Sequence, residues 1–242
     1  MMGLFNILSP VFDVVDGAAA SVLPATLRLA LWAAVLAIGT MLLYKVLSPQ
    51  ARIGVAKREA REARRKLNSF DGEFADAGPL IRDQFASAFK HIGLVVPGTI
   101  IAILPLLCFL VWADNHFDYN LPTNGTTPTV ATVPASASGA NAHWDGSHNP
   151  PAVSVTTVGH ATQAYPMTAP VPIITKYSAW NWLVGNPLGY LPDDSPIDAV
   201  RIDLPEREFI HVGPSWMRGW LAVFIPVMFI VSLLMFKWAR IE

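Results

Sequence analysis

Apolar residues recur at alternating spacings of three and four in two runs between residues 53 and 92, within and at the end of a charged segment, 47–91. In the first half this pattern is carried by Ile53, Ala56, Ala60, Ala63, Leu67, Phe70 and Phe74. In the second half it is carried by Ile81, Phe85, Ala88 and Ile92. Gly78-Pro79 separates the halves and suits a helix start, because proline at the first helical position loses no intrahelical hydrogen bond. The spacing is that of a coiled-coil seam, so we expect an antiparallel helical hairpin packed seam to seam.

Three apolar segments are long enough to cross a bilayer as helices. They are residues 24–46, 92–112 and 216–238. At about 1.5 Å per residue, helices of this length span roughly the 30 Å of a hydrocarbon core. Trp216 and Trp220 stand at one end of the third segment, with Lys237 and Trp238 at the other, as is typical of residues at membrane interfaces. The pattern therefore predicts three transmembrane helices.

The first residues, 1–23, predict a short amphipathic helix. Their apolar positions at helical spacing are Leu4, Ile7, Leu8, Val11, Phe12 and Val15. Asp13 and Asp16 are the only charges and no basic leader precedes an apolar core, so we expect this segment to be retained rather than cleaved as a signal peptide. One interpretation places it at the outer membrane interface. The alternative is a lead-in that touches only the neighbouring helices.

Between the second and third apolar segments lie about a hundred residues of a different character. Residues 113–151 are rich in Thr, Ala, Ser, Gly, Asn and Pro, which predicts a flexible linker. Residues 152–215 contain short β-like runs, which predict a small β-rich domain. These runs are 152–158, 171–175, 199–204 and 208–212. The same domain contains an apolar, mainly aromatic cluster for which we expect burial, formed by Tyr177, Trp180, Trp182, Leu183 and Tyr190.

Composition and charge turn this pattern into a topology. The 242 residues are 52% hydrophobic and 14% charged, with a mean hydropathy of +0.40, which indicates a membrane protein. Residues 45–90 hold ten Lys and Arg against six acids, whereas residues 113–215 hold three against nine. By the positive-inside rule, the hairpin and the C-terminus are cytoplasmic, and the N-terminus and residues 113–215 are outside, in the periplasm if the chain lies in a cell inner membrane. The expected fold is thus an α-helical membrane protein with a cytoplasmic coiled-coil hairpin and a β-rich outside insertion.

No residue pattern predicts an enzyme, a metal site or a cofactor. His143 and His148 with Asp145 between them are weak metal candidates, and Asp193, Asp194 and Asp198 lack the spacing of a calcium loop. The sequence has no glycine-rich phosphate loop after a strand and no nucleophile elbow. We therefore expect a non-enzymatic protein that needs no metal or cofactor and has no role in DNA binding.

The order of segments, with several local residues, resembles the YidC-like membrane protein insertase superfamily. The resemblance is closest to its short archaeal members and to the related core subunit of the endoplasmic reticulum membrane protein complex. It covers residues 7–117 and 216–240. The residues that carry it are Ser9-Pro10, Leu43-Tyr44-Lys45, Ser48-Pro49-Gln50, Phe89, Lys90, Pro97, Pro105, Trp112, Phe117, Gly219-Trp220-Leu221 and Ser232. The outside insertion of about a hundred residues departs from the short members.

The resemblance implies an insertase or membrane chaperone that receives weakly hydrophobic helices of client proteins in a polar groove open to the cytoplasm. A basic residue of the first span occupies that groove in the family, and Arg28 is its best match; the alternative is that Arg28 reaches the outer headgroups. Thr40, Thr99 and Ser232 are further groove candidates, although hydroxyls in membrane helices often bond to their own backbone. The expected partners are membrane lipids and client or partner transmembrane helices.

The first arm of the hairpin carries a basic surface. Its candidate contact residues are Arg58, Arg61, Arg64 and Arg65. They suit ribosomal RNA or anionic headgroups, which makes the ribosome a candidate partner, and the alternative is a solvated helix face. A second function from another class also fits the sequence: a structural or assembly subunit that grips a larger membrane complex through its helix faces and its outside domain.

Overall fold

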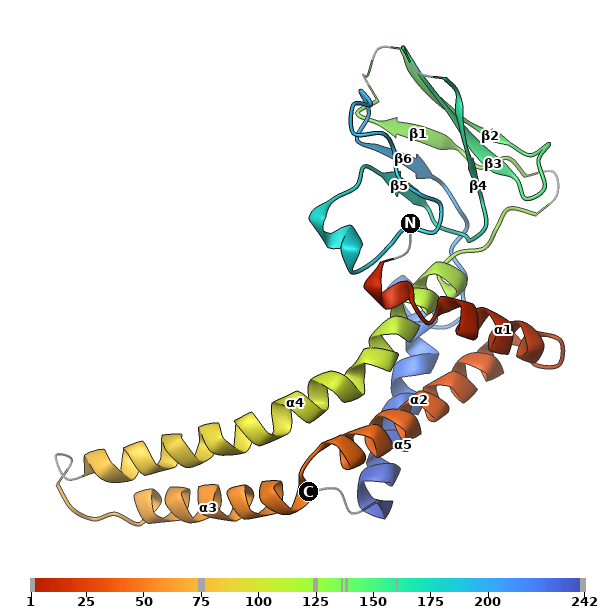
Figure 1. The fold of residues 1–242 in the computed structure, drawn as a ribbon. Coiled ribbons are helices and arrows are strands. Elements are labelled where there is room, and N and C mark those ends of the chain that lie inside the picture. The colour runs from red at the N-terminus through yellow and green to blue at the C-terminus, as the bar shows by residue number, and fades with distance from the viewer. Residues whose placement is uncertain are drawn as a thin grey trace. The chain divides into compact units, whose positions relative to one another are not determined.

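The computed structural model describes residues 3–73, 77–123, 126–135, 137, 139–159 and 161–239. Three helices are long and apolar enough to cross a membrane: α2 (Ala25–Leu47), α4 (Gly78–Phe117) and α5 (Leu221–Trp238). Two further helices, α1 (Ser9–Ala20) and α3 (Gln50–Asn68), lie on either side of α2 in the chain (Figure 1). The chain divides into two compact units: unit 1 comprises residues 1–30 and 107–225, and unit 2 comprises residues 31–106 and 226–242.

The apolar helices differ from expectation mainly at their ends. α2 begins and ends one residue later than the segment 24–46. α5 begins at Leu221 rather than at residue 216, because a short 3-10 turn, η4 (Ser215–Met217), precedes it. α4 continues from Gly78 to Phe117 through Pro97 and Pro105, so the second arm of the hairpin and the second apolar segment form a single helix.

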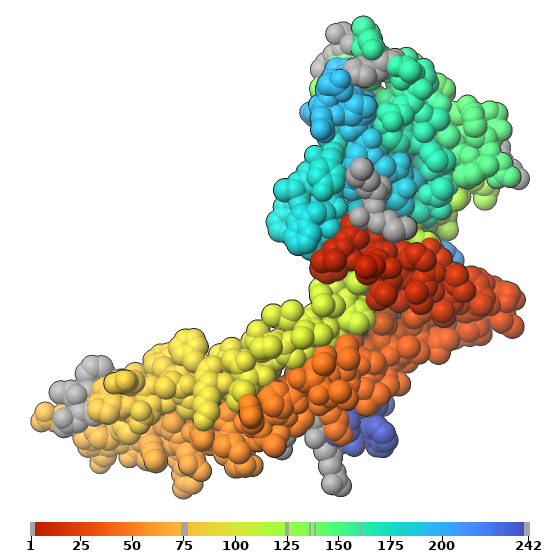
Figure 2. All heavy atoms as spheres, viewed as in Figure 1, coloured from red at the N-terminus to blue at the C-terminus, as the bar shows by residue number. Residues whose placement is uncertain are grey.

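In unit 2, α3 runs beside the first part of α4, which confirms the helical hairpin (Figures 1 and 2). The seam of the first arm also holds. Ile53 and Ala56 are fully buried, while Ala60, Ala63 and Leu67 are partly buried between exposed charged residues. Phe70 lies beyond the end of α3 and is exposed, and Phe74 lies outside the described residues.

The seam predicted for the second arm holds at Ile81 and Ala88, which are partly buried, but is wrong at Phe85 and Ile92, so the buried face is rotated about the helix axis from the predicted one. Phe85 and Ile92 are 61% and 51% exposed, whereas the neighbouring face of α4 is partly buried. That face carries Gln84, Ser87, Ala88, His91 and Leu94. Two contacts define the rotation: Lys90 Nζ lies 2.8 Å from Glu59 Oε2, and Gly98 packs against Ser48. Periodicity shows which residues share a face, but not which face meets the partner helix.

Unit 1 contains two small antiparallel sheets (Figure 1). One has the strand order β1 (Val130–Val133), β6 (Ala199–Ile202), β5 (Ile173–Thr175). The other has the order β2 (Ala140–Asp145), β3 (Ala152–Thr157), β4 (Gln163–Pro166). Their shared core is mainly aliphatic, with Val153, Ile174, Ile197 and Val200 fully buried.

Three of the predicted β-like runs coincide with strands, namely β3, β5 and β6. Residues 208–212 form no strand, and β4 was not predicted. The linker predicted over 113–151 does not hold for β1 and β2, which pair with β6 and β3. The reason is that the β-branched run of β1 gains a complete ladder with β6, placing Val130 opposite Ile202.

The expected burial of the aromatic cluster is wrong for three of its members. Trp180 and Trp182 belong to a 3-10 turn, η3 (Ala179–Trp182), and are 76% and 58% exposed. Tyr177 is also exposed, although its ring meets Tyr190 edge to face. Aliphatic strand residues, with Tyr165 and Met167, fill the core instead.

Candidate functional site

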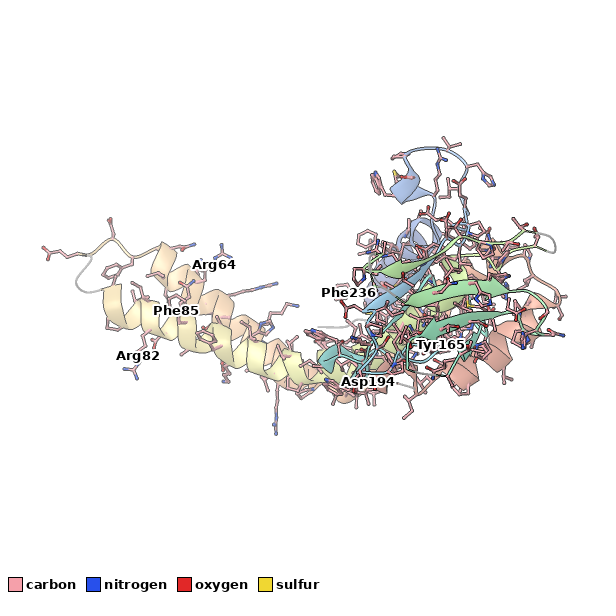
Figure 3. The ribbon with its side chains drawn as sticks, turned by 90° about the horizontal axis from the view of Figure 1, so that it is seen from above. Arg64, Arg82, Phe85, Tyr165, Asp194 and Phe236 are labelled. Atoms are coloured by element: carbon pink, nitrogen blue, oxygen red, sulfur yellow. The ribbon has the colours of Figure 1, made fainter. Side chains whose placement is uncertain are left out.

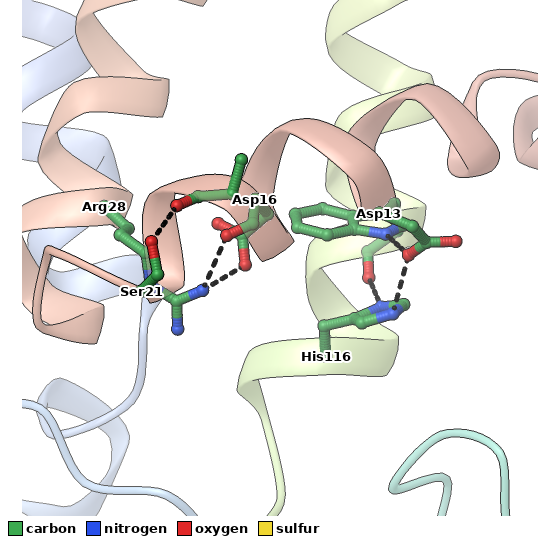
Figure 4. Close-up of polar contacts among 7 residues, drawn as sticks. Asp13, Asp16, Ser21, Arg28 and His116 are labelled. Carbon is green, nitrogen blue, oxygen red and sulfur yellow. Dashed lines mark hydrogen bonds and ion pairs between the residues drawn. The ribbon is translucent and has the colours of Figure 1, made fainter.

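The strongest of the predicted groove residues, Arg28, lies at the start of α2 in unit 1 and is held by α1. Its guanidinium forms an ion pair with the carboxylate of Asp16, and its Nη1 also donates to the Asp16 carbonyl at 3.3 Å (Figure 4). Both side chains are 12% exposed. The groove candidate is thus a largely buried cation with its own counter-charge.

Two arginines lie near the ring of Phe117, the last residue of α4. The Cζ atoms of Arg28 and Arg207 lie 5.5 and 5.6 Å from its centroid. Arg207 also lies 5.3 Å from the centroid of Phe209. Burial lowers the pKa of Arg207, as does the positive charge of Arg28, while Asp16 opposes the shift. Two cations and one carboxylate therefore share this site.

A second set of contacts binds α1 to the C-terminal end of α4. Asp13 accepts a hydrogen bond of 2.7 Å from Trp112 Nε1 and lies 3.1 Å from His116 Nε2 (Figure 4). Phe12 is buried edge to face against Phe109, with ring centroids 5.5 Å apart. The acids of α1 thus contact protein, whereas Ile7, Val11, Val14 and Val15 on this amphipathic segment remain exposed, the reverse of a helix lying on a soluble domain.

Sequence reasoning missed the partners of Arg28. Asp13 and Asp16 entered it only as charges that argue against a signal peptide. Two acids three residues apart in an otherwise apolar helix are a signal for buried pairing, because such acids rarely stay unpaired. Phe117 and Arg207 carry no such signal, since their meeting depends on the folded chain.

The other groove candidates, Thr40, Thr99 and Ser232, lie in unit 2. Thr99 donates its hydroxyl to the Val95 carbonyl at 3.0 Å, one turn back on its own helix, as the alternative interpretation expects. Thr40 on α2 and Ser232 on α5 are partly buried. No hydrogen bond joins the three hydroxyls within the part of the chain that the structure describes. At the other end of α2, Lys45 Nζ donates to the Ala239 carbonyl at 2.8 Å.

The four basic candidates of the hairpin, Arg58, Arg61, Arg64 and Arg65, are all exposed on α3. None of them forms an ion pair with a described residue, and Figure 3 shows Arg64 extending away from the hairpin. Their charges are therefore available to a partner.

The weak metal candidates serve the local structure of loops. Asp145 accepts hydrogen bonds from Ser147 N at 2.9 Å and Ser147 Oγ at 2.6 Å, and these bonds lower the pKa of Asp145. Asp198 pairs with Lys176 at 3.2 Å. Within the described residues, no group of three His, Cys, Asp or Glu side chains is placed to hold a metal ion.

Comparisons of this chain with protein families, with curated proteins and with solved structures give no match.

Proposed function

We propose that this chain is a non-enzymatic membrane protein of the insertase or chaperone type, similar to the YidC-like group, which receives apolar segments of client proteins. The observation that carries this proposal is an exposed apolar track along one face of α4. Its residues, spaced by three and four, are Phe85, Phe89, Ile92, Val96, Ile100 and Ile103. The track begins on the hairpin and continues, without a break in the helix, into the most apolar part of α4.

On the hairpin, which the proposal places in the cytoplasm, exposed large apolar side chains are costly in water and usually mark an interaction site. Phe85 and Phe89 are 61% and 66% exposed, and their rings stack with centroids 6.4 Å apart. A helical client could bury its apolar residues against the track, as amphipathic helices do in apolar grooves. The exposed arginines of α3 would attract acidic client segments, ribosomal RNA or anionic lipid headgroups.

The proposal includes a location. α2, α4 and α5 cross a cell inner membrane, with the hairpin and the C-terminus in the cytoplasm and the β-rich domain in the periplasm. The charge asymmetry between residues 45–90 and 113–215 supports this orientation. The exposed apolar residues of α1 support its place at the outer interface. The partners are membrane lipids, client helices and the ribosome, with no DNA, metal or cofactor.

Photo-crosslinking during translation tests the proposal. A photoreactive residue placed at Phe89 should capture nascent apolar segments, whereas the same probe at Asp83, exposed on another face of the helix, should capture far fewer. The double substitution Phe85→Ser and Phe89→Ser should lower client insertion, and Asp83→Asn should leave it unchanged. Equal capture from both positions, or full insertion by the double variant, would reject the track.

A specific observation favours a second candidate, a structural or assembly subunit. The periplasmic portion is an ordered pair of sheets whose η3 turn exposes Trp180 and Trp182, and tryptophan is enriched at binding hot spots. A photoreactive residue at Trp182 distinguishes the two functions. Stable crosslinks from Trp182 to one mature membrane subunit, without nascent-chain capture at Phe89, would establish the assembly role in place of insertion.

A further inference from the structure

A small cavity of mixed charge lies in unit 1, beside the start of α5. Its volume is about 190 Å³. Its apolar lining residues are Trp216, Trp220 and Leu221, and its charged lining residues are Asp118, Glu206, Arg207, Glu208 and Arg218. Apolar and charged walls meet here immediately before the first turn of a helix that, in the proposed function, enters the membrane.

Backbone contacts position the charged lining residues Asp118, Glu206 and Arg207. Tyr119 and Glu206 form an antiparallel bridge, and Arg207 N donates to the Asp118 carbonyl at 2.9 Å. Phe209 N also donates to the carbonyl of Arg218, another lining residue, at 2.7 Å. The cavity is thus built by paired segments from the end of α4 and from the loop that precedes α5.

Three charged side chains of this cavity form no ion pair with any residue that the structure describes. The Arg207 guanidinium packs on the rings of Phe117 and Phe209, and no hydrogen bond or ion pair to a described residue satisfies its N–H groups. Asp118 and Glu206 likewise form no ion pair with a described residue, although they line the same cavity as Arg207. Arg218 differs, because it pairs with Glu208 at 3.2 Å.

We propose that this cavity binds the headgroup of a zwitterionic phospholipid with a primary amine, of the phosphatidylethanolamine type. The phosphate accepts hydrogen bonds from Arg207, and the ammonium donates to Asp118 and Glu206. The acyl chains leave past Leu221 and Ile225, which are both exposed and stand one turn apart at the start of α5. The inference rests on the membrane location in the proposed function and does not depend on insertase activity.

The charge pattern excludes simpler ligands. A free anion would meet Arg207 but also the unpaired carboxylates of Asp118 and Glu206. A lone cation would meet the acids but also Arg207. A ligand that carries both a negative and a positive charge can pair with Arg207 and also with Asp118 and Glu206. A primary ammonium has three N–H donors for the two carboxylates, whereas a quaternary amine has none.

The pKa shifts of Asp118 and Arg207 agree with a missing charged partner for each side chain. Burial raises the pKa of Asp118, and the nearby acids Asp114 and Glu206 raise it further. Burial and Arg28 lower the pKa of Arg207. Each group is thus less readily charged than usual, and a bound ammonium and phosphate would reverse both effects.

Lipid retention by the full-length protein tests the inference. The purified protein is reconstituted in nanodiscs with equal parts phosphatidylethanolamine, phosphatidylcholine and phosphatidylglycerol, extracted into detergent, and its retained lipids are counted by native mass spectrometry. We expect phosphatidylethanolamine to be enriched over the other two. Asp118→Asn with Glu206→Gln should abolish that preference, and Arg207→Gln should reduce phosphatidylethanolamine retention roughly tenfold, the effect of losing a charge-assisted hydrogen bond.

Matched controls are Arg201→Gln and Asp203→Asn, which remove exposed charges of the same domain outside the cavity. Arg207→Lys retains the charge and should keep part of the retention. Equal retention of the three lipids by the unaltered protein, or the same preference in the cavity variants, would overturn the inference. Binding of free O-phosphoethanolamine as tight as that of the lipid would overturn the lipid as its source. Insertion activity is scored separately, so failure of either proposal is recognisable by itself.

Discussion

The ion pair between Arg28 and Asp16 lets the two roles of Arg28 be separated. Because Arg28 and Asp16 pair with each other and both side chains are 12% exposed, neutralising one removes a counter-charge from the other in a largely buried site. Arg28→Gln or Asp16→Asn should each destabilise the protein by about 3–5 kcal/mol, and the double variant by clearly less than the sum. Thermal unfolding in detergent measures this. The exposed pair Glu59–Lys90 is the control, and its neutralisation should cost below about 1 kcal/mol.

The same variants test the groove role of Arg28. If Arg28 acts only through Asp16, the double variant should regain the insertion activity that Arg28→Gln loses. Loss of insertion in both, with the folded state retained, would instead assign Arg28 a direct contact with clients.

Asp118 should make stability depend on pH. Its folded-state pKa is raised by burial and by Asp114 and Glu206, so the folded chain binds this proton more tightly than the unfolded chain. The contribution of Asp118 to stability is therefore lost as the pH rises from the unfolded pKa, about 3.9, through the folded one. In lipid-free detergent, Asp118→Asn should unfold at a higher temperature than the unaltered protein at neutral pH.

That advantage should shrink to zero below the unfolded pKa, where the Asp118 carboxyl is protonated in both the folded and the unfolded state. Asp203→Asn, the exposed control, should change the unfolding temperature little at either pH. A constant difference across the titration would exclude Asp118 as its cause.

At the scale of elements, the contact between Gly98 and Ser48 defines how α4 meets the turn between α2 and α3. A Cβ added at Gly98 would lie 2.2 Å from Ser48 Oγ, which is buried and has no hydrogen-bond partner among the described residues. Gly98→Ala should therefore destabilise unit 2 by about 1–3 kcal/mol through overpacking. Ser48→Ala should be nearly neutral alone, because it removes an unsatisfied hydroxyl, and should relieve part of the cost of Gly98→Ala.

Limited proteolysis of the hairpin, with thermal unfolding, measures these effects. Gly93→Ala is the control, since nothing lies within 4 Å of a Cβ added at Gly93. Equal effects at Gly93 and Gly98 would show that helix propensity, rather than this contact, controls stability.

The sequence predicted the apolar helices and the spacing of their buried residues better than it predicted which helices and strands pack or pair with one another. The apolar runs of α2 and α5 and the seam of α3 were predictable, because each depends on local spacing. The rotation of α4 was not, because Glu59–Lys90 and Gly98–Ser48 are contacts between distant residues. Strand β1 was hidden in a Thr- and Pro-rich stretch, since its pairing with β6 joins residues far apart in the sequence.

The whole molecule has one testable asymmetry, its proposed orientation across a membrane. With Cys108→Ala as background, a membrane-impermeant thiol reagent should label Asp194→Cys in intact spheroplasts and Arg61→Cys only after permeabilisation. Both original residues are exposed, so the reagent can reach either position. Labelling of both in the same compartment would overturn the topology, and with it both proposed functions.

At this scale, the sequence identified three apolar helices, a basic hairpin and a β-containing insertion. The best candidate site residue, Arg28, forms a largely buried ion pair in the structure. Its counter-charge, Asp16, and its aromatic neighbour, Phe117, could not be predicted from the sequence. Asp16 lies on α1, Phe117 ends α4, and Arg207 follows β6, so only the folded chain brings them together.

Residues 5–6 form hydrogen bonds with residues 183–185, a segment that is synthesised much later. Phe5 N donates to the Leu183 carbonyl at 2.9 Å, and Asn6 Oδ1 accepts a hydrogen bond of 2.8 Å from Gly185 N. The contacts within the hairpin, such as Glu59 with Lys90, join residues that are far less separated in the sequence than Asn6 and Gly185, and contacts of smaller separation form sooner. During translation, the hairpin can therefore fold before residues 183–185, the partners of residues 5–6, have been synthesised. During synthesis the protein would then pass through a partly folded stage, in which residues 5–6 are unpaired with residues 183–185 and a chaperone can bind this protein.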